Sequence, residues 1–223
     1  MDQTETPAPG EAPIMRPLGA GDPAPTFMLP DPDDVMISSA ELLENGPLVV
    51  TFYRGIWCPY CRQDLKDLGN AAPDIRSCGA SLVAIAHQTV PDSNGKFQRE
   101  HGLEFPILDD RQGDVAVAYR IRWSPQELAA AEERLRKLPG LATETTWILP
   151  MQARYVIGRD GIIAYADINA DYRQHPDPCE IVPLLRETSR AWLNSKSRGS
   201  VAKVVARKSM NARASGFMAI PLG

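Results

Sequence analysis

The stretch TFYRGIWCPYCRQDL (residues 51–65) decides the fold of this chain, because it joins a strand to a helix through two closely spaced cysteines. The apolar run of residues 47–53 predicts a buried strand. Residues 62–68 carry the spacing of an amphipathic helix. Cys58 and Cys61 therefore lie at the turn between the two elements, where a pair of thiols indicates redox chemistry.

The proline between the two cysteines predicts how the helix begins. We expect Cys58 to be the N-cap and Pro59 the first helical residue, where its missing N–H costs nothing. Unpaired amides and the positive end of the helix dipole then favour the thiolate of Cys58. The pKa of a cysteine thiol at such sites is roughly 3.5–7.5. Arg54 and Arg62 would strengthen this effect if either side chain lies within a few ångströms.

The spacing of the two cysteines allows a disulfide after a small adjustment, because Cβ atoms at i and i+3 lie about 5–6 Å apart and a disulfide needs about 3.5–4.5 Å. Cys61 belongs to the apolar stripe of the helix and is expected to face the core, with Cys58 at the exposed end. The alternatives are two structural cysteines or a zinc site, which needs more ligands. The residues that could serve as further zinc ligands are scattered singly along the chain: Cys78, Cys179, His87, His101 and His175.

We expect no metal and assign the histidines no role. An incidental role is also favoured for Cys78 and Cys179 over that of a distant resolving thiol. Cys179 falls in the first turn of a predicted helix, where some thiolate character is expected.

The remaining elements alternate along the chain. The first helix is expected to end near residue 72. Strands are predicted at 81–86, 105–110, 154–157 and 162–165, and helices at 96–101, 114–119, 124–137 and from Asp177 to about residue 193. This order predicts an α/β fold: a central mixed sheet with helices on both faces and a hairpin at one edge.

Both ends of the chain differ in composition from its middle. Residues 1–20 are rich in Pro, Ala, Glu and Thr and predict a disordered extension. Residues 195–223 carry only basic charges and predict a solvated tail, with contact to an anionic partner as the alternative. One domain, residues 21–194, is expected between them.

Composition excludes several functional classes. The net charge of −4 over 223 residues gives no electrostatic case for binding nucleic acid. No apolar stretch approaches the ~20 residues that span a membrane, and no secretory signal is visible. The sequence therefore predicts a cytoplasmic protein.

Five segments occur in the order and spacing of a known family: GDPAPTFMLP (21–30), TFYRGIWCPYCRQDL (51–65), SLVAIAHQT (81–89), FPILDD (105–110) and YVIGRDGII (155–163). Through them the chain resembles the peroxiredoxin-like proteins of the alkyl hydroperoxide reductase/thiol-specific antioxidant group, within the thioredoxin superfamily. The CPYC tetrad also resembles the glutaredoxin active site. The resemblance implies a thioredoxin-like fold, with Cys58 and Cys61 as catalytic residues.

Two family registers assign the attacking cysteine differently. In the thioredoxin and glutaredoxin register the nucleophile is Cys58. In the peroxiredoxin register it is Cys61, and the threonine and proline of the usual peroxide pocket are replaced by Cys58 and Arg54. Gln152 stands where typical peroxiredoxins carry an arginine, and Pro150 is two residues earlier than the cis-proline of thioredoxin-like folds. The supporting residues are Arg54, Trp57, Pro59 and Gln152.

Three functions follow. The first is an antioxidant thiol peroxidase that reduces hydrogen peroxide or organic hydroperoxides through a Cys58/Cys61 dithiol–disulfide cycle. Thioredoxin, glutaredoxin or glutathione would be the reductant, without a cofactor, and the resemblance allows a homodimer. The second is a glutaredoxin- or thioredoxin-type disulfide oxidoreductase with Cys58 as nucleophile. The third is a non-catalytic redox sensor.

Overall fold

The computed structural model describes residues 16–86, 92–122, 150–169, 174–175 and 177–195. The elements in chain order are β1 (Met28–Pro30), β2 (Met36–Ser38), α1 (Ser39–Asn45), β3 (Leu48–Phe52), α2 (Pro59–Ser77), β4 (Ser81–Ala86), α3 (Ser93–His101), β5 (Ile107–Asp109), α4 (Asp114–Ala118), β6 (Gln152–Ile157), β7 (Ile163–Asn169) and α6 (Pro178–Ser195). The helix predicted at 124–137 lies outside the described residues.

The centre of the fold is a five-stranded mixed sheet of order β5-β4-β3-β6-β7. The strands β3, β4 and β5 are parallel, whereas β6 is antiparallel to both β3 and β7. All five residues of the central strand β3 are buried, as the apolar run predicted. The predicted α/β thioredoxin-like fold is thus confirmed, with the β6–β7 hairpin at one edge of the sheet.

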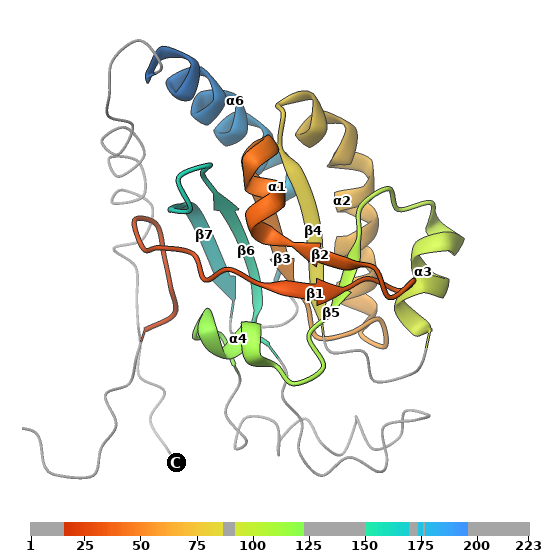
Figure 1. The fold of residues 1–223 in the computed structure, drawn as a ribbon. Helices are drawn as coiled ribbons and strands as arrows, with labels where there is room; N and C mark the ends of the chain where they lie inside the picture. Colours follow the sequence, from red (N-terminus) through yellow and green to blue (C-terminus); the bar gives the residue numbers. More distant parts are fainter. Residues whose placement is uncertain (1–15, 87–91, 123–149, 170–173, 176, 196–223) are drawn as a thin grey trace, which may run out of the picture.

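Helices cover both faces of the sheet, as Figure 1 shows. On one face α2 and α6 pack together, with Leu65 and Leu68 in the same buried cluster as Ile181 and Leu185. On the other face α1, α4 and the β1–β2 hairpin enclose a second cluster, which includes Phe52. The sheet therefore separates two apolar cores.

Two helices differ in their bounds from the sequence prediction, and three further elements were not predicted. The helix α2 continues past Pro73 to Ser77, because a proline removes only one hydrogen bond while Ile75 extends the buried stripe. The helix α3 begins earlier than predicted, at Ser93. The strands β1 and β2 and the helix α1 were not predicted; Ser38 caps α1 by accepting a hydrogen bond from the amide of Glu41 at 3.4 Å.

Contacts with the domain begin before residue 21. Leu18 is buried in the core, and its amide donates to the carbonyl oxygen of Tyr119 at 3.2 Å. Arg16 and Asp22 form an ion pair at 2.6 Å. The last residues of the predicted N-terminal extension are therefore held against the sheet.

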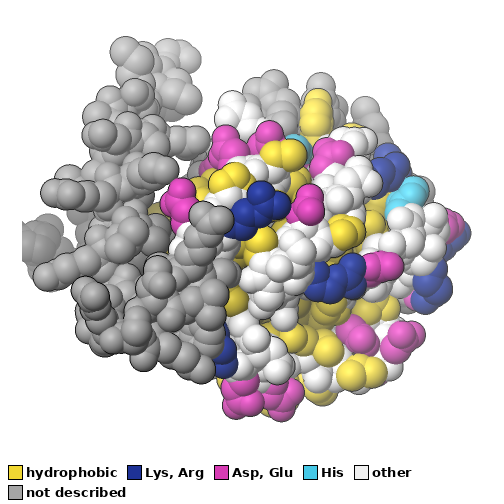
Figure 2. All heavy atoms as spheres, turned by 90° about the horizontal axis from the view of Figure 1, so that it is seen from above, with side chains coloured by type: hydrophobic (Ala, Val, Ile, Leu, Met, Phe, Trp, Pro, Cys, Tyr) yellow, Lys and Arg dark blue, Asp and Glu magenta, His cyan; other side chains and the backbone are white. Residues whose placement is uncertain are grey.

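The surface carries mixed charge. On the face shown in Figure 2, acidic and basic side chains lie interspersed among apolar and neutral ones. Among the described helices, none combines the length and the apolar character that crossing a membrane requires.

Candidate active site

The dithiol lies where β3 ends and α2 begins. Cys58 has extended backbone angles, φ −82° and ψ 119°, and is the N-cap of α2, while Pro59 is its first residue. The amide of Arg62 donates to the carbonyl oxygen of Cys58 at 3.0 Å, closing the first helical turn. The predicted start of the helix is confirmed, and both thiols are free in this structure.

Both cysteines are buried, so the expectation of an exposed Cys58 is wrong: its exposed fraction is 1%. In the turn before the helix, the guanidinium of Arg54 lies 5.1 Å from the ring centroid of Trp57. Gly55 makes this turn possible, because its φ is +145° and a Cβ there would lie 2.4 Å from the Trp57 indole nitrogen. Sequence spacing alone gave no sign that Cys58 is buried.

Arg54 stabilises a thiolate at Cys58. Its Nη2 donates to the Cys58 Sγ at 3.5 Å, whereas Arg62 is exposed. The pKa of Cys58 is lowered to about 5, first by a hydrogen bond from the Cys61 side chain and then by the Cys61 amide and Arg54, against the opposing effect of burial. Cys58 is therefore a thiolate at neutral pH.

Cys61 has the opposite character. Its pKa is raised well above the ordinary value, first by its hydrogen bond to Cys58 and then by burial. Its Sγ also donates to Oε1 of Gln152 at 3.5 Å. Gln152 reaches the dithiol because β6 is antiparallel to β3, with Ala153 opposite Phe52, so the first residue of β6 lies at the carboxyl end of β3.

A buried polar cluster lies behind Gln152, and its members Asp64, Arg154 and His175 were not predicted from the sequence as part of the site. Asp64, three residues after Cys61 on α2, accepts from Gln152 Nε2 at 3.3 Å. It also pairs with Arg154 at 2.7 Å, and the two side chains are 1% and 0% exposed. Asp64 lies on the buried stripe of the helix and Arg154 within an apolar strand, and a charge in each such place is the only sequence signal of this pair.

His175 closes the cluster from the segment before α6. Its Nδ1 lies 3.8 Å from Oδ2 of Asp64, and its ring stacks on Tyr60 with centroids 6.3 Å apart. Burial lowers the pKa of His175, which favours the neutral ring. His175 is far in sequence from the other residues of the cluster, so no role was predicted for it.

The other cysteines lie apart from the dithiol. Cys78 caps the far end of α2, about 25–30 Å away along the helix. Cys179 is exposed in the first turn of α6, where Asp177 caps the helix and raises the pKa of the thiol, so the predicted thiolate character is wrong. Within the described ranges, no three His, Cys, Asp or Glu side chains gather as metal ligands would. His87 lies outside these ranges.

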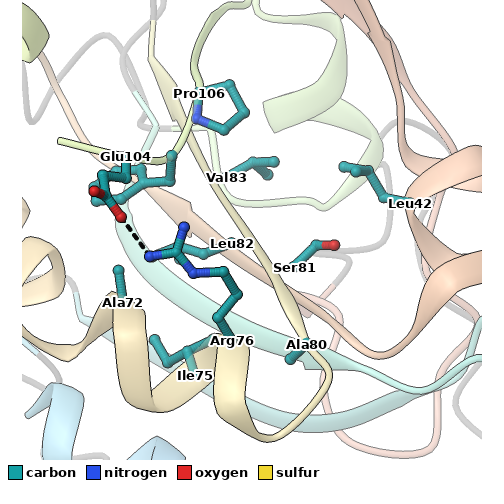
Figure 3. Close-up of a pocket in the computed structure, with 11 residues that line it drawn as sticks. Leu42, Ala72, Ile75, Arg76, Ala80, Ser81, Leu82, Val83, Glu104 and Pro106 are labelled. Atoms are coloured by element: carbon teal, nitrogen blue, oxygen red, sulfur yellow. Dashed lines mark hydrogen bonds and ion pairs between the residues drawn. The ribbon is translucent and has the colours of Figure 1, made fainter.

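Figure 3 shows a hollow of about 200 Å³. It lies at the end of the sheet opposite to the dithiol. The start of β4, the end of α2 and the segment before β5 line it, and the ion pair of Arg76 and Glu104 spans it. Its lining is mostly apolar and contains no thiol. The hollow is therefore separate from the redox chemistry.

The low pKa of Cys58 predicts a pH profile. The reactive thiolate should be present above pH 5 and be lost as the pH falls through about 5. Cys61→Ala, which removes the hydrogen bond that lowers the pKa of Cys58 most, should raise the midpoint by about 1–2 pH units, and Cys61→Ser, which keeps a donor, by less. The measurement is the rate of Cys58 alkylation against pH. Equal midpoints in the two variants would contradict the assignment.

Comparison with known proteins gives consistent matches. Residues 20–166 match the AhpC/TSA family. A Mycobacterium tuberculosis protein named "Putative peroxiredoxin" is 31% identical over 102 residues, 46% of this chain and 64% of that protein's own length. Thiol-disulfide oxidoreductase ResA of Bacillus subtilis is 26% identical over 104 residues, 47% of this chain and 57% of that protein. The crystal structure of peroxidoxin BcpB from M. tuberculosis has the same fold: TM-score 0.59, 22% identity, covering 78% of this chain and 97% of that one.

Proposed function

Because this chain belongs to the AhpC/TSA family, we propose that it is a thiol-dependent peroxidase that reduces hydrogen peroxide or organic hydroperoxides through Cys58 and Cys61. The observation that carries the proposal is a thiolate held beside a guanidinium, with Arg54 Nη2 3.5 Å from the Cys58 Sγ. The second thiol lies three residues further on, in the first turn of the same helix.

The cycle needs only these two thiols and an external reductant. A thiolate attacks one peroxide oxygen, an S–O bond forms as the O–O bond breaks, and the leaving alkoxide or hydroxide takes up a proton. The other thiol then attacks the sulfenic acid, forming the disulfide and releasing water. Two electrons from a second dithiol, or from two glutathione molecules, restore the reduced pair.

The burial of the dithiol favours a small oxidant. Cys58 and Cys61 are 1% and 0% exposed, so a peroxide reaches them more easily than a disulfide within a folded protein. Arg54 offers donors both to the thiolate and to the negative charge that develops on the leaving oxygen.

The proposal extends to the reductant, the cellular compartment, the domain bounds and the assembly. Thioredoxin, glutaredoxin or glutathione would supply the electrons, which favours the cytoplasm, where these reductants keep thiols reduced. Residues 21–194 would form the catalytic domain and 195–223 a basic extension. A homodimer is the assembly we expect.

The test is rapid mixing of the reduced protein with hydrogen peroxide or an organic hydroperoxide. We expect sulfenic acid formation at least ~100-fold faster than for a free thiol, whose thiolate fraction at pH 7 is only a few per cent. Replacing the attacking cysteine by serine should abolish the reaction. Replacing the other should let the sulfenic acid accumulate without a disulfide. Cys78→Ser is the matched control and should react as the unsubstituted protein does.

A disulfide oxidoreductase is the second candidate, favoured by the CPYC tetrad and the likeness to ResA. In that function Cys58 would attack a mixed disulfide and Cys61 would release the product. Peroxide reactivity no greater than that of a free thiol, together with rapid turnover of a glutathionylated peptide, would replace the peroxidase by this activity. Inertness toward both substrates would leave a redox sensor.

A further inference from the structure

We propose that Asp64 is a positioning residue that orients the amide of Gln152 and thereby reserves Cys61 as the resolving thiol, leaving Cys58 to attack. The proposal rests on the proposed function only for its place in the cycle. The hydrogen-bond arrangement itself concerns the reduced protein before any substrate binds.

The orientation of Gln152 follows from the chemistry of its neighbour. Asp64, as a carboxylate paired with Arg154 at 2.7 Å, offers oxygen acceptors and no donor. The Gln152 group that faces it at 3.3 Å must therefore be the NH₂ group. The carbonyl oxygen of the same amide then faces Cys61, at 3.5 Å from Sγ.

This orientation decides which cysteine keeps its proton. An acceptor oxygen beside a sulfur stabilises the protonated thiol and disfavours the thiolate. The single proton of the Cys61 thiol has two acceptors within reach, the Gln152 oxygen and the Cys58 sulfur, and it can donate to either only while Cys61 is protonated. The positively charged guanidinium of Arg54 lies beside the Cys58 sulfur. The Gln152 contact favours the protonated thiol at Cys61, and the Arg54 contact favours the thiolate at Cys58.

The arrangement also suits both steps of the cycle. The Cys58 thiolate attacks the peroxide oxygen, forming the S–O bond while the O–O bond breaks, and the leaving alkoxide takes up a proton. Cys61 then attacks the sulfur of the Cys58 sulfenic acid, and its own proton leaves with the hydroxyl group as water. Until that step Gln152 holds Cys61 in its protonated form.

Asp64→Asn gives the decisive variant. Asparagine can keep its oxygen toward Arg154 and turn its NH₂ group toward Gln152, which would rotate the Gln152 amide and point its NH₂ group at Cys61. We expect the ratio of Cys58 to Cys61 alkylation, measured at pH 7 with limiting iodoacetamide and fragment-ion mass spectrometry, to fall by about tenfold. The control Asp67→Asn, one helical turn further along α2, should leave the ratio unchanged.

In Asp64→Asn the loss of a negative charge would by itself affect both thiols. A second set of variants that lack the Gln152 amide separates this effect from the rotation of the amide. Gln152→Leu removes the amide, and in this background Asp64→Asn should no longer change the alkylation ratio. An unchanged ratio in Asp64→Asn alone, or the same change with and without Gln152, would overturn the proposal. Neither measurement involves peroxide, so the proposal and the peroxidase function can fail separately.

A measurement on the unsubstituted protein remains decisive even if Asp64→Asn does not fold. In nuclear magnetic resonance spectra of the reduced protein, the Gln152 side-chain NH₂ protons should show no contact with the β protons of Cys61 and slow exchange with water. Strong contacts to the Cys61 β protons would mean the reverse orientation and would overturn the proposal.

Discussion

Arg154→Met is expected to lower the free energy of unfolding by about 3–5 kcal/mol, because it leaves a carboxylate buried without its cation. The Asp64 and Arg154 side chains are 1% and 0% exposed, so water cannot solvate the remaining charge. Adding Asp64→Leu to this variant should recover most of the loss, since buried ion pairs are often replaced by apolar residues without a net cost. Urea unfolding of the four proteins of this cycle gives the coupling between the two residues.

An exposed ion pair provides the control. Arg76 and Glu104 are 56% and 66% exposed, and Arg76→Met should cost less than about 1 kcal/mol. Similar losses for Arg76→Met and Arg154→Met would show that burial is not the source of the effect.

Gly46→Ala is expected to destabilise the fold by about 3 kcal/mol, at the upper end of the cost of overpacking. The reason is steric, since Gly46 has an extended backbone with φ 172° and needs no special conformation. A Cβ at this position would lie 1.8 Å from the carbonyl oxygen of Gly79, in the turn between α2 and β4. Two backbone segments would have to move apart where β3 and β4 begin to pair.

The matched substitution is Gly19→Ala. Its Cβ would meet only the end of the Arg16 side chain, at 3.7 Å, so the midpoint of urea unfolding should stay within experimental error. A normal midpoint for Gly46→Ala would contradict the close approach of the two turns.

The sequence was sufficient to predict the elements that carry their own local signals. The apolar run of β3, the helix start at Pro59 and the hairpin of β6 and β7 are each set by residues close in the chain. The strands β1 and β2 have three residues each, too few to show a period. Their pairing depends on the tertiary core instead.

The site was predicted only in part for the same reason. Cys58, Cys61 and Arg54 lie within eight positions of one another, and local reasoning brought them together. Asp64 meets Gln152 and Arg154 across 88 and 90 residues, and this contact is created by the antiparallel register of β3 and β6. Whether a charge in an apolar segment is exposed or paired depends on such long-range contacts, which one sequence does not reveal.

The strand order has a consequence for how this chain could change its chemistry. β3 lies between β4 and β6, and the chain leaving β3 through α2 turns away from β6 toward β4. The carboxyl end of β3 thus lies beside the first residue of the antiparallel strand β6, on the side of the sheet where the parallel strands end and where open α/β sheets hold their ligands. The position of the reaction is a property of this connectivity, while Arg54 and Gln152 are side chains carried to it. Substitutions at those two positions can alter substrate preference while the connectivity keeps the reaction in the same place.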